Sequence, residues 1–260
     1  MDLKGKVALI TGAAGAIGRA YTDELLRCGA KVAICDLDIE KGEKLVDDFS
    51  LKYGKGKTIF CQCDVTDYPQ FEESFQTTIS AFGGLDIVIN NAGIFNDRFW
   101  ELEVDVNLNG VIRGTLLAQR LMRKERHGKG GGGGVVVMTA STLGLMSTPC
   151  APIHCATKHA IIGFTRSFAD PFHYSLTGVR VMALCPGPTK CDTSSDEIKK
   201  ALLSPEFEPL YHRTYDNVTY QSAQSVGKAL IHILQKGTNG SVWVVENQQP
   251  PREVKFPSTF

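Results

Sequence analysis

Three residue types that can exchange a proton stand between positions 141 and 158 of this chain. Ser141 supplies a hydroxyl, His154 an imidazole and Lys158 an amine. The β-branched run before Ser141 predicts a strand, and an apolar-periodic helix is predicted to open at Lys158. Because an α/β sheet binds its ligands in the crevice beyond the carboxyl ends of the strands, we expect these side chains to face one crevice. The set is a candidate centre for proton transfer at a substrate oxygen.

A glycine-rich turn follows the first predicted strand, residues 6–11. Gly12, Gly15 and Gly18 would let the backbone approach a pyrophosphate, which the N–H groups of the following helix then stabilise. The alternative is that the three glycines only form a tight turn and bind no nucleotide. The order strand, turn, helix and second strand is what a dinucleotide site requires, and it favours that interpretation.

Asp36 ends the second predicted strand, 18 residues after Gly18. A carboxylate at this distance accepts hydrogen bonds from the ribose hydroxyls and repels a 2′-phosphate. Neither Ala13 nor Leu37 offers a compensating cation, so the predicted cofactor is NAD and not NADP. The alternative is that Asp36 only caps the next helix.

Strand and helix patterns alternate along the chain, which predicts one α/β domain over residues 1–260. A helix is expected from Asp105 to Arg126, with Asn107 near its start, and the helix that contains Lys158 is expected to continue to Tyr174. Residues from about 188 to 220 have weak periodicity and mixed polar and aromatic composition. A long stretch of this kind over a crevice is often a substrate lid.

Charge and composition limit the classes of partner. Lys plus Arg and Asp plus Glu both number 28, so no net field attracts nucleic acid or an anionic membrane. Residues 123–134 are interpreted as a solvated glycine-rich loop. No apolar run approaches the ~18 residues of a membrane span, and no signal peptide precedes the first strand, so a cytoplasmic protein is expected. The eight cysteines are expected to be free thiols, and no metal site is predicted.

These motifs resemble the short-chain dehydrogenase/reductase family over nearly the whole chain. Thr11 to Gly18 is similar to its cofactor turn, Asn90 to Gly93 to its strand-four motif, and Pro186-Gly187 to its motif after strand six. Within the family, the stretch from Gly163 to Thr189 and the ending NGSVWVVE are similar to insect alcohol dehydrogenases and NAD-dependent 15-hydroxyprostaglandin dehydrogenases.

The resemblance implies a doubly wound Rossmann domain with a seven-stranded parallel sheet, helices on both faces and assembly as a homodimer or homotetramer. It implies that Lys158 holds the nicotinamide ribose, Ser141 orients the substrate oxygen and Asn107 supports a water that relays protons. Cys191 departs from the usual threonine two residues after Thr189. The implied cofactor-binding residues are Gly12, Gly15, Ile17, Gly18, Asp36, Asp64, Val65, Asn91, Ala92, Gly93, Lys158, Pro186, Gly187 and Thr189.

His154 stands where the family has the tyrosine of its Tyr-x-x-x-Lys motif, 13 residues after Ser141. A neutral imidazole is a competent proton acceptor for alcohol oxidation, but it reaches less far than a phenol and suits carbonyl reduction less. Three interpretations stay open. The chain is an NAD-dependent alcohol dehydrogenase that works through His154, or a silent nucleotide-binding or structural protein, or it carries histidine where the natural protein has tyrosine.

The expected lining of the crevice is apolar, which predicts a hydrophobic alcohol or the matching carbonyl as substrate. Two cations of the lid, Lys190 and Arg213, leave an acidic lipid open as the alternative. The expected lining residues are Phe95, Leu143, Leu145, Met146, Pro149, Cys150 and Ile153.

Overall fold

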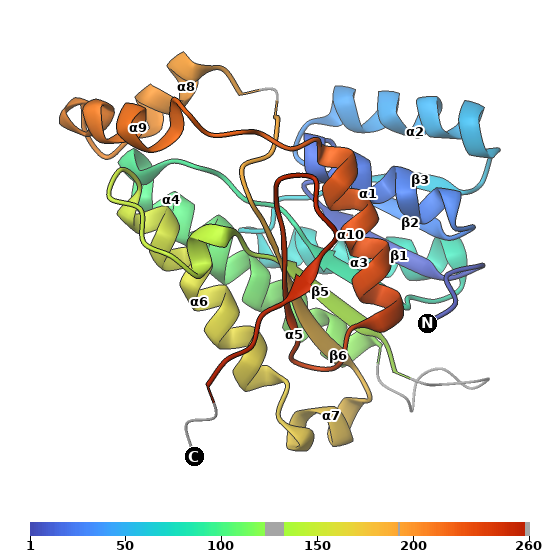
Figure 1. Cartoon of the computed structure of the whole chain (residues 1–260). Coiled ribbons are helices and arrows are strands. Elements are labelled where there is room, and N and C mark those ends of the chain that lie inside the picture. Colours follow the sequence, from blue (N-terminus) through green and yellow to red (C-terminus); the bar gives the residue numbers. More distant parts are fainter. Residues whose placement is uncertain (123–132, 192, 258–260) are drawn as a thin grey trace.

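A single eight-stranded sheet organises the computed structural model, which describes residues 1–122, 133–191 and 193–257 (Figure 1). The strands lie in the order β3-β2-β1-β4-β5-β6-β7-β8, so the chain crosses over after β3 to the other side of β1. Of the predicted loop 123–134, only the last two residues are among those described. The strands are β1 (Val7–Thr11), β2 (Lys31–Asp36), β3 (Thr58–Gln62), β4 (Ile87–Asn90), β5 (Val135–Thr139), β6 (Arg180–Pro186), β7 (Val242–Val245) and β8 (Arg252–Glu253).

The predicted fold class is confirmed, but the strand number is wrong by one. Strands β1 to β7 pair in parallel, and β8 pairs antiparallel with β7. The chain reverses direction through Asn247 and Gln248, whose φ angles are 53° and 59°. Strand β8 has two exposed polar residues and therefore lacks the apolar run by which a strand is predicted.

Helices cover both faces of the sheet because the strand side chains alternate between two apolar cores. Leu9 and Val88 pack with α3 (Tyr68–Phe82), α5 (Gly110–Leu121) and α6 (Pro152–Phe168). Ile10 and Ile89 pack on the other face with three helices that Figure 1 shows together beside β1 and β2. These helices are α1 (Ala16–Arg27), α2 (Ile39–Tyr53) and α10 (Ala223–Lys236).

The helix that carries Asn107 begins earlier than predicted and is not uniform. It starts as α4 (Trp100–Val104), continues as a π-helical segment (Asp105–Asn109) and becomes α5. Extra residues in a helical turn reorient the side chains on it, and such segments are frequent at functional sites. Asn107 lies in the middle of this segment.

Helix α6 also begins earlier than predicted, at Pro152 and not at Lys158. Proline is favoured in the first helical turn because its missing N–H has no partner there. His154 therefore lies in the first turn, and Lys158 lies one turn further along the same face. The helix ends at Phe168, and Asp170 caps a separate helix, α7 (Pro171–Thr177), so the prediction that Tyr174 shares the helix of Lys158 is wrong.

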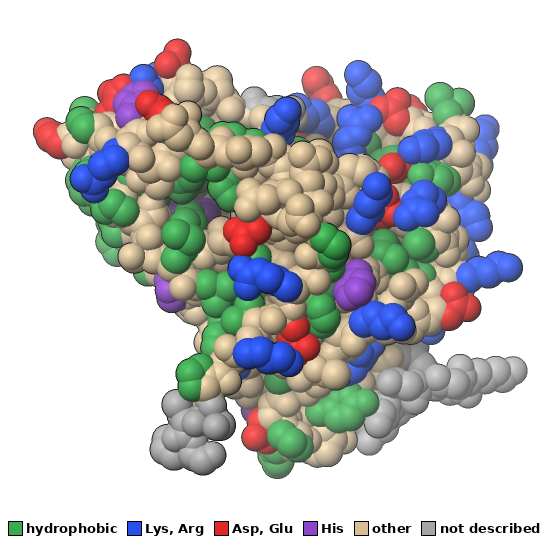
Figure 2. All heavy atoms as spheres, viewed as in Figure 1, with side chains coloured by type: hydrophobic (Ala, Val, Ile, Leu, Met, Phe, Trp, Pro, Cys, Tyr) green, Lys and Arg blue, Asp and Glu red, His purple; other side chains and the backbone are tan. Residues whose placement is uncertain are grey.

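The segment after β6 is more regular than its weak periodicity suggested. It contains α8 (Ser195–Ala201), a 3₁₀ turn (Pro205–Phe207) and α9 (Glu208–Tyr215), which Figure 1 shows above α4 and α6. Leu202 and Tyr211 of this segment pack on Cys150 and Ala151, which directly precede α6. Figure 2 shows the surface hollowed beneath α8 and α9, with hydrophobic side chains at the hollow. No helix within the described ranges is long and apolar enough to cross a membrane.

Candidate active site

The glycine turn after β1 is shaped so that side chains are excluded from it. Gly12 has a φ of +61°, and a Cβ there would lie 2.8 Å from the Cα of Ala92. A Cβ on Gly18 would lie 2.3 Å from the carbonyl oxygen of Gly12. Gly15 is the N-cap of α1 and offers no side-chain acceptor to the free N–H groups of the first turn. Those N–H groups and the helix dipole suit a phosphate, so this turn fits the pyrophosphate of a dinucleotide.

The strand-four motif is fastened to this turn by hydrogen bonds. The backbone N–H groups of Asn91 and Ala92 both donate to Oγ1 of Thr11, each at 3.0 Å. Nδ2 of Asn91 donates to the carbonyl oxygens of Thr11 and Gly12, at 3.0 and 3.1 Å. The ends of β1 and β4 thus form one rigid wall. It contains the predicted cofactor residues Asn91, Ala92 and Gly93.

Asp36 lies beside the same turn. Its Oδ2 accepts the N–H of Ala14 at 2.8 Å, and its Oδ1 accepts the N–H of Asp38 at 3.1 Å. The N-cap of α2 is Asp38, which accepts from Lys41, so the interpretation of Asp36 as a helix cap is wrong. The carboxylate of Asp36 remains half-buried at the end of β2, where a ribose would be recognised.

The other predicted cofactor residues flank this wall along the sheet. Oδ1 of Asp64 accepts the N–H of Thr66 at 2.8 Å, and Val65 is buried against the start of α5. At the end of β6, Gly187 donates to the carbonyl oxygen of Val245 at 2.8 Å, and Oγ1 of Thr189 donates to that of Gly187 at 2.8 Å. Ile17 packs with the core under α1, and Pro186 is the last residue of β6.

Two of the four predicted catalytic residues, Asn107 and Lys158, lie beside Gly93. A Cβ on Gly93 would lie 3.2 Å from Oδ1 of Asn107 and 3.5 Å from Nζ of Lys158. Asn107 exchanges two hydrogen bonds with Ile94, accepting its N–H at 2.8 Å and donating to its carbonyl at 2.9 Å. Lys158 is buried, which lowers the pKa of its amine to about 8.

Ser141 lies just beyond β5, and its side chain makes a local contact. Its Oγ accepts the N–H of Leu143 at 3.1 Å and thereby caps a short 3₁₀ turn (Thr142–Gly144). Lys158 reaches the same end of β5, because its Nζ donates to the carbonyl oxygen of Thr139, the last residue of β5, at 3.2 Å. No hydrogen bond links Oγ of Ser141 to either His154 or Lys158 within the described part of the chain.

The imidazole of His154 is engaged on one side by a carboxyl group that sequence analysis did not include. Nδ1 lies 2.8 Å from Oε1 of Glu103 and 3.2 Å from the carbonyl oxygen of Ile94. The side chain keeps 13% of its surface exposed, whereas that of Glu103 is fully buried. Burial lowers the pKa of His154, and the charge of Lys158 acts in the same direction, so the ring is neutral at pH 7.

Comparison with known proteins shows which family the chain belongs to. A family model described as short chain dehydrogenase matches residues 6–201. The chain is 44% identical to rat 15-hydroxyprostaglandin dehydrogenase [NAD(+)] over 190 residues, 73% of this chain and 70% of that protein. It is 32% identical to alcohol dehydrogenase 1 of Ceratitis capitata over 262 residues, covering 100% of this chain and 98% of that protein. The chain belongs to the short-chain dehydrogenase family.

A solved structure gives the same answer for the fold. A short-chain dehydrogenase/reductase from Burkholderia phymatum, crystallised in complex with NAD, superposes with a TM-score of 0.75 at 23% identity. The match covers 90% of this chain and 87% of the other. The matching family model and the 44% identical relatives confirm the family resemblance inferred from the sequence motifs.

Sequence analysis of this short-chain dehydrogenase missed two buried acids beside His154. Glu103 and Asp97 are both fully buried, and Asp97 accepts the backbone N–H groups of Ile153 and His154 at 2.8 and 3.0 Å. Glu103 precedes Asn107 by one helical turn, and its Oε1 lies 3.4 Å from Nδ2 of Asn107. An acid one turn before Asn107, the predicted catalytic asparagine, on the same helix face was the available signal.

Tyr21, which is linked to Lys158 through Thr139, is no substitute for the missing phenol. The hydroxyl of Tyr21 lies 3.4 Å from Oγ1 of Thr139, whose carbonyl accepts from Lys158. Tyr21 is fully buried, and burial raises the pKa of its phenol. A phenol that resists ionisation cannot act as the base of this short-chain dehydrogenase.

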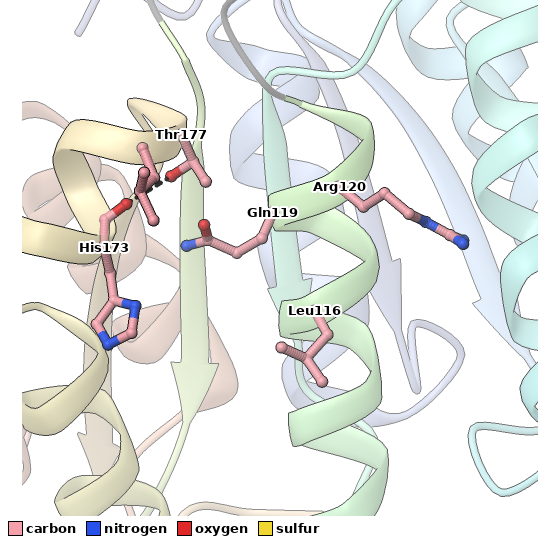
Figure 3. Close-up of a pocket in the computed structure, with 6 residues that line it drawn as sticks. Leu116, Gln119, Arg120, His173 and Thr177 are labelled. Atoms are coloured by element: carbon pink, nitrogen blue, oxygen red, sulfur yellow. Dashed lines mark hydrogen bonds between the residues drawn. The ribbon is translucent and has the colours of Figure 1, made fainter.

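One cavity of the short-chain dehydrogenase lies away from all of these residues. Figure 3 shows it between α5 and α7, with Gln119 and Arg120 on one helix and His173 and Thr177 on the other. The ring of His173 stacks on Phe168 with centroids 4.7 Å apart. The bond drawn there is a local one from Oγ1 of Thr177 to the backbone carbonyl of His173 at 3.1 Å. Within the described ranges, no group of three His, Cys, Asp or Glu side chains is placed to hold a metal.

Proposed function

We propose that this short-chain dehydrogenase is an NAD-dependent oxidoreductase that transfers a hydride between NAD and a hydrophobic alcohol or carbonyl compound. The observation that carries the proposal is the meeting of Asn107, Lys158 and Gly93 at the end of the rigid wall formed by β1 and β4. In this proposal Lys158 binds the nicotinamide ribose, and His154, one helical turn away, handles the proton.

NAD fits the chain's own residues at its adenosine and pyrophosphate ends. The cradle at Gly12 and Gly18 admits no side chain, and the first turn of α1 offers free N–H groups to a phosphate. The carboxylate of Asp36 favours two ribose hydroxyls and disfavours a 2′-phosphate. When bound, NAD supplies the hydride acceptor for alcohol oxidation. The relatives named as NAD(+)-dependent 15-hydroxyprostaglandin dehydrogenases support the same choice.

The substrate we propose is hydrophobic, because apolar groups of the lid segment and of the region before α6 pack with Phe95, which contacts His154. Phe95 lies against the imidazole with ring centroids 5.2 Å apart. Leu202, Tyr211 and Cys150 form the adjoining apolar cluster, which Phe95 also contacts. Residues 188–220 serve as the lid in this proposal, in the single domain 1–260. The name of the 44% identical relatives favours a lipid alcohol within this class.

His154 is proposed to accept the hydroxyl proton in alcohol oxidation. Its neutral ring has one protonated and one free nitrogen, and the free nitrogen can take a proton. Ser141 is proposed to orient the substrate oxygen, with Asn107 supporting a relay water. We further propose that the protein is cytoplasmic and assembles as a homodimer or homotetramer. Light scattering of the purified chain would test the oligomeric state.

The second candidate function is a silent NAD(H)-binding protein, and one observation favours it. A phenol at position 154 would carry its hydroxyl beyond the ring, whereas the imidazole ends sooner and has Nδ1 committed to Glu103 at 2.8 Å. A misplaced proton acceptor can cost about 100-fold in rate.

NADH binding and alcohol-dependent NADH formation, measured on the wild type and on His154→Tyr, test both functions. Binding by both proteins with turnover by the wild type supports the oxidoreductase. Binding by both with turnover only in His154→Tyr supports the silent protein. Absence of NADH binding in both would overturn the two functions together.

A further inference from the structure

The contact between His154 and Glu103 fixes which imidazole nitrogen carries the proton. Nδ1 lies 2.8 Å from Oε1 of Glu103 and 3.2 Å from the carbonyl oxygen of Ile94, and both are acceptors. The amide nitrogen of Asn107 is also 3.5 Å from Nδ1, but it already donates to Ile94 at the shorter distance of 2.9 Å. A nitrogen that faces two acceptors must be the protonated one, so Nε2 holds the free lone pair.

Glu103 has a second buried acid behind it. Burial raises the pKa of both Glu103 and Asp97, and the two carboxyl groups interact as a hydrogen-bonded pair. Such a bond exists only when one acid is protonated; with both ionised, Oε2 of Glu103 would have no donor. One proton is shared by the pair, and Oε1 of Glu103, which faces Nδ1 of His154 and the N–H of Asn96, is an acceptor.

The same acids also place the helix that carries His154. Asp97 accepts the first free N–H groups of α6, from Ile153 and His154. Oε1 of Glu103 accepts the N–H of Asn96 at 3.2 Å, which holds the loop beneath the ring. The backbone and the side chain of His154 are therefore positioned by one buried unit.

An imidazole that acts as a base beside Lys158 must become cationic next to another cation, and Glu103 reduces the cost of this. Taking a proton makes the ring cationic, and Lys158 on the same helix opposes this. Oε1 of Glu103 lies 2.8 Å from Nδ1, and an acceptor in direct contact stabilises the cation in a buried environment where Coulomb interactions are strong.

We propose that Glu103 is a positioning residue for His154, which holds the imidazole in its Nδ1–H form and stabilises the positive charge that the ring gains. The proposal rests on the proposed function. In alcohol oxidation the O–H bond breaks and its proton passes to Nε2, the carbinol carbon loses its hydride to NAD as oxidant, and the C=O double bond forms. The Nδ1–H bond to Glu103 persists or shortens as the ring becomes cationic, as in other base–carboxylate pairs.

The decisive experiment is ¹⁵N NMR of the histidine rings in the full chain between pH 6 and 8, with the His154 signals assigned from a His154→Gln sample. The expected result is a neutral Nδ1–H tautomer. A neutral Nε2–H ring or a doubly protonated ring overturns the proposal. This readout needs no turnover, so it stands even if the protein proves catalytically silent.

Substitutions then test the effect of the contact on catalysis. Glu103→Gln is expected to lower kcat for alcohol oxidation by about 100-fold or more, because an amide can donate to Nδ1 and reverse the tautomer. NADH affinity is expected to stay within about twofold. Glu101→Gln makes the same change on the exposed face of the same helix and is expected to leave kcat unchanged. Equal kcat in all three proteins overturns the positioning role. Wild-type NADH binding without turnover would instead remove the oxidoreductase function.

Discussion

Nζ of Lys158 donates a hydrogen bond to the carbonyl oxygen of Thr139 at 3.2 Å, from a position where the amine is almost fully buried. The bond ties the middle of α6 to the end of β5 and fixes the amine at the base of the candidate site. Desolvation lowers the pKa of this amine to about 8 from an ordinary value of 10.5, and the charge of Glu103 only partly compensates.

The first prediction concerns stability at alkaline pH. Between pH 8 and 10.5 the unfolded chain binds more protons at this lysine than the folded chain, so its contribution to stability rises with pH in that window. The free energy of unfolding of the wild type, minus that of Lys158→Met, is expected to increase by about 3 kcal/mol across the window. Denaturant titrations at several pH values measure it. Lys228→Met, at an exposed site of α10, is the control and should show no such increase.

The cofactor half of the site was predictable from sequence because it depends on local rules. A glycine turn between a strand and a helix, and an acid at the end of the next strand, fix positions of backbone and charge whatever the rest of the chain does. Gly12, Gly18 and Asp36 accordingly lie where they were expected.

The catalytic half was only partly predictable because it depends on contacts between distant segments. His154 and Glu103 are 51 positions apart in sequence, and the spacing of Glu103 from Asn107 is a local signal for the acid but not for its contact with His154. The start of α6 was also predicted wrongly, at Lys158. The helix begins about a turn and a half earlier because Pro152 occupies its first turn, where proline is favoured.

The second prediction concerns the choice between NAD and NADP. Replacing the carboxylate in Asp36→Ala is expected to weaken NADH binding by about 10- to 100-fold, because charged hydrogen bonds of about 1.5–3 kcal/mol are lost. NADPH binding should strengthen, since the repulsion of the 2′-phosphate disappears. Fluorescence titration with both nucleotides gives the ratio. Asp38→Asn changes the charge two residues away but can still cap α2, and its ratio should match the wild type.

The third prediction concerns the closest approach in the glycine turn. A methyl group in Gly18→Ala would meet the Gly12 carbonyl oxygen at 2.3 Å and the Ala13 Cα at 2.6 Å, so α1 must move away from the turn. Overpacking of this kind costs about 1–3 kcal/mol, and a shift of the turn that takes this much from the NADH binding energy lowers the affinity by roughly 5- to 150-fold.

The matched control for that change is another helical glycine. A Cβ on Gly163, on the exposed face of α6, would meet no heavy atom within 4 Å. Gly163→Ala is expected to stabilise the protein by up to about 1 kcal/mol and to leave NADH affinity unchanged. Equal NADH affinity in Gly18→Ala and Gly163→Ala would contradict the proposed pyrophosphate cradle.

The fourth prediction concerns the pH dependence of alcohol oxidation. Burial and the charge of Lys158 lower the pKa of His154, so its neutral form persists well below pH 6.5. The rate of the wild type should therefore stay level between about pH 5 and 7, below the pKa of about 8 of Lys158, whereas that of His154→Tyr should rise with pH, because a phenol with an ordinary pKa of about 10 must ionise first. Initial rates of NADH formation distinguish the two profiles. A wild-type rate that falls below an apparent pKa near 6.5 would show that the ring is not held neutral.

The fifth prediction concerns the lid. Leu202 is only 1% exposed in the cluster with Tyr211 and Cys150, while its neighbour Leu203 is 38% exposed. Truncating a buried leucine costs about 2–5 kcal/mol, and here the loss falls on a small cluster separate from the two cores beside the sheet. Leu202→Ala should therefore loosen residues 195–215 without lowering the global melting temperature in proportion. We expect amide exchange in that segment to be faster. The KM for a long apolar alcohol should rise about 10-fold, and the NADH affinity should be unchanged. Leu203→Ala removes the same atoms from the surface, so exchange that rises equally in both variants would mean that the cluster does not hold the lid.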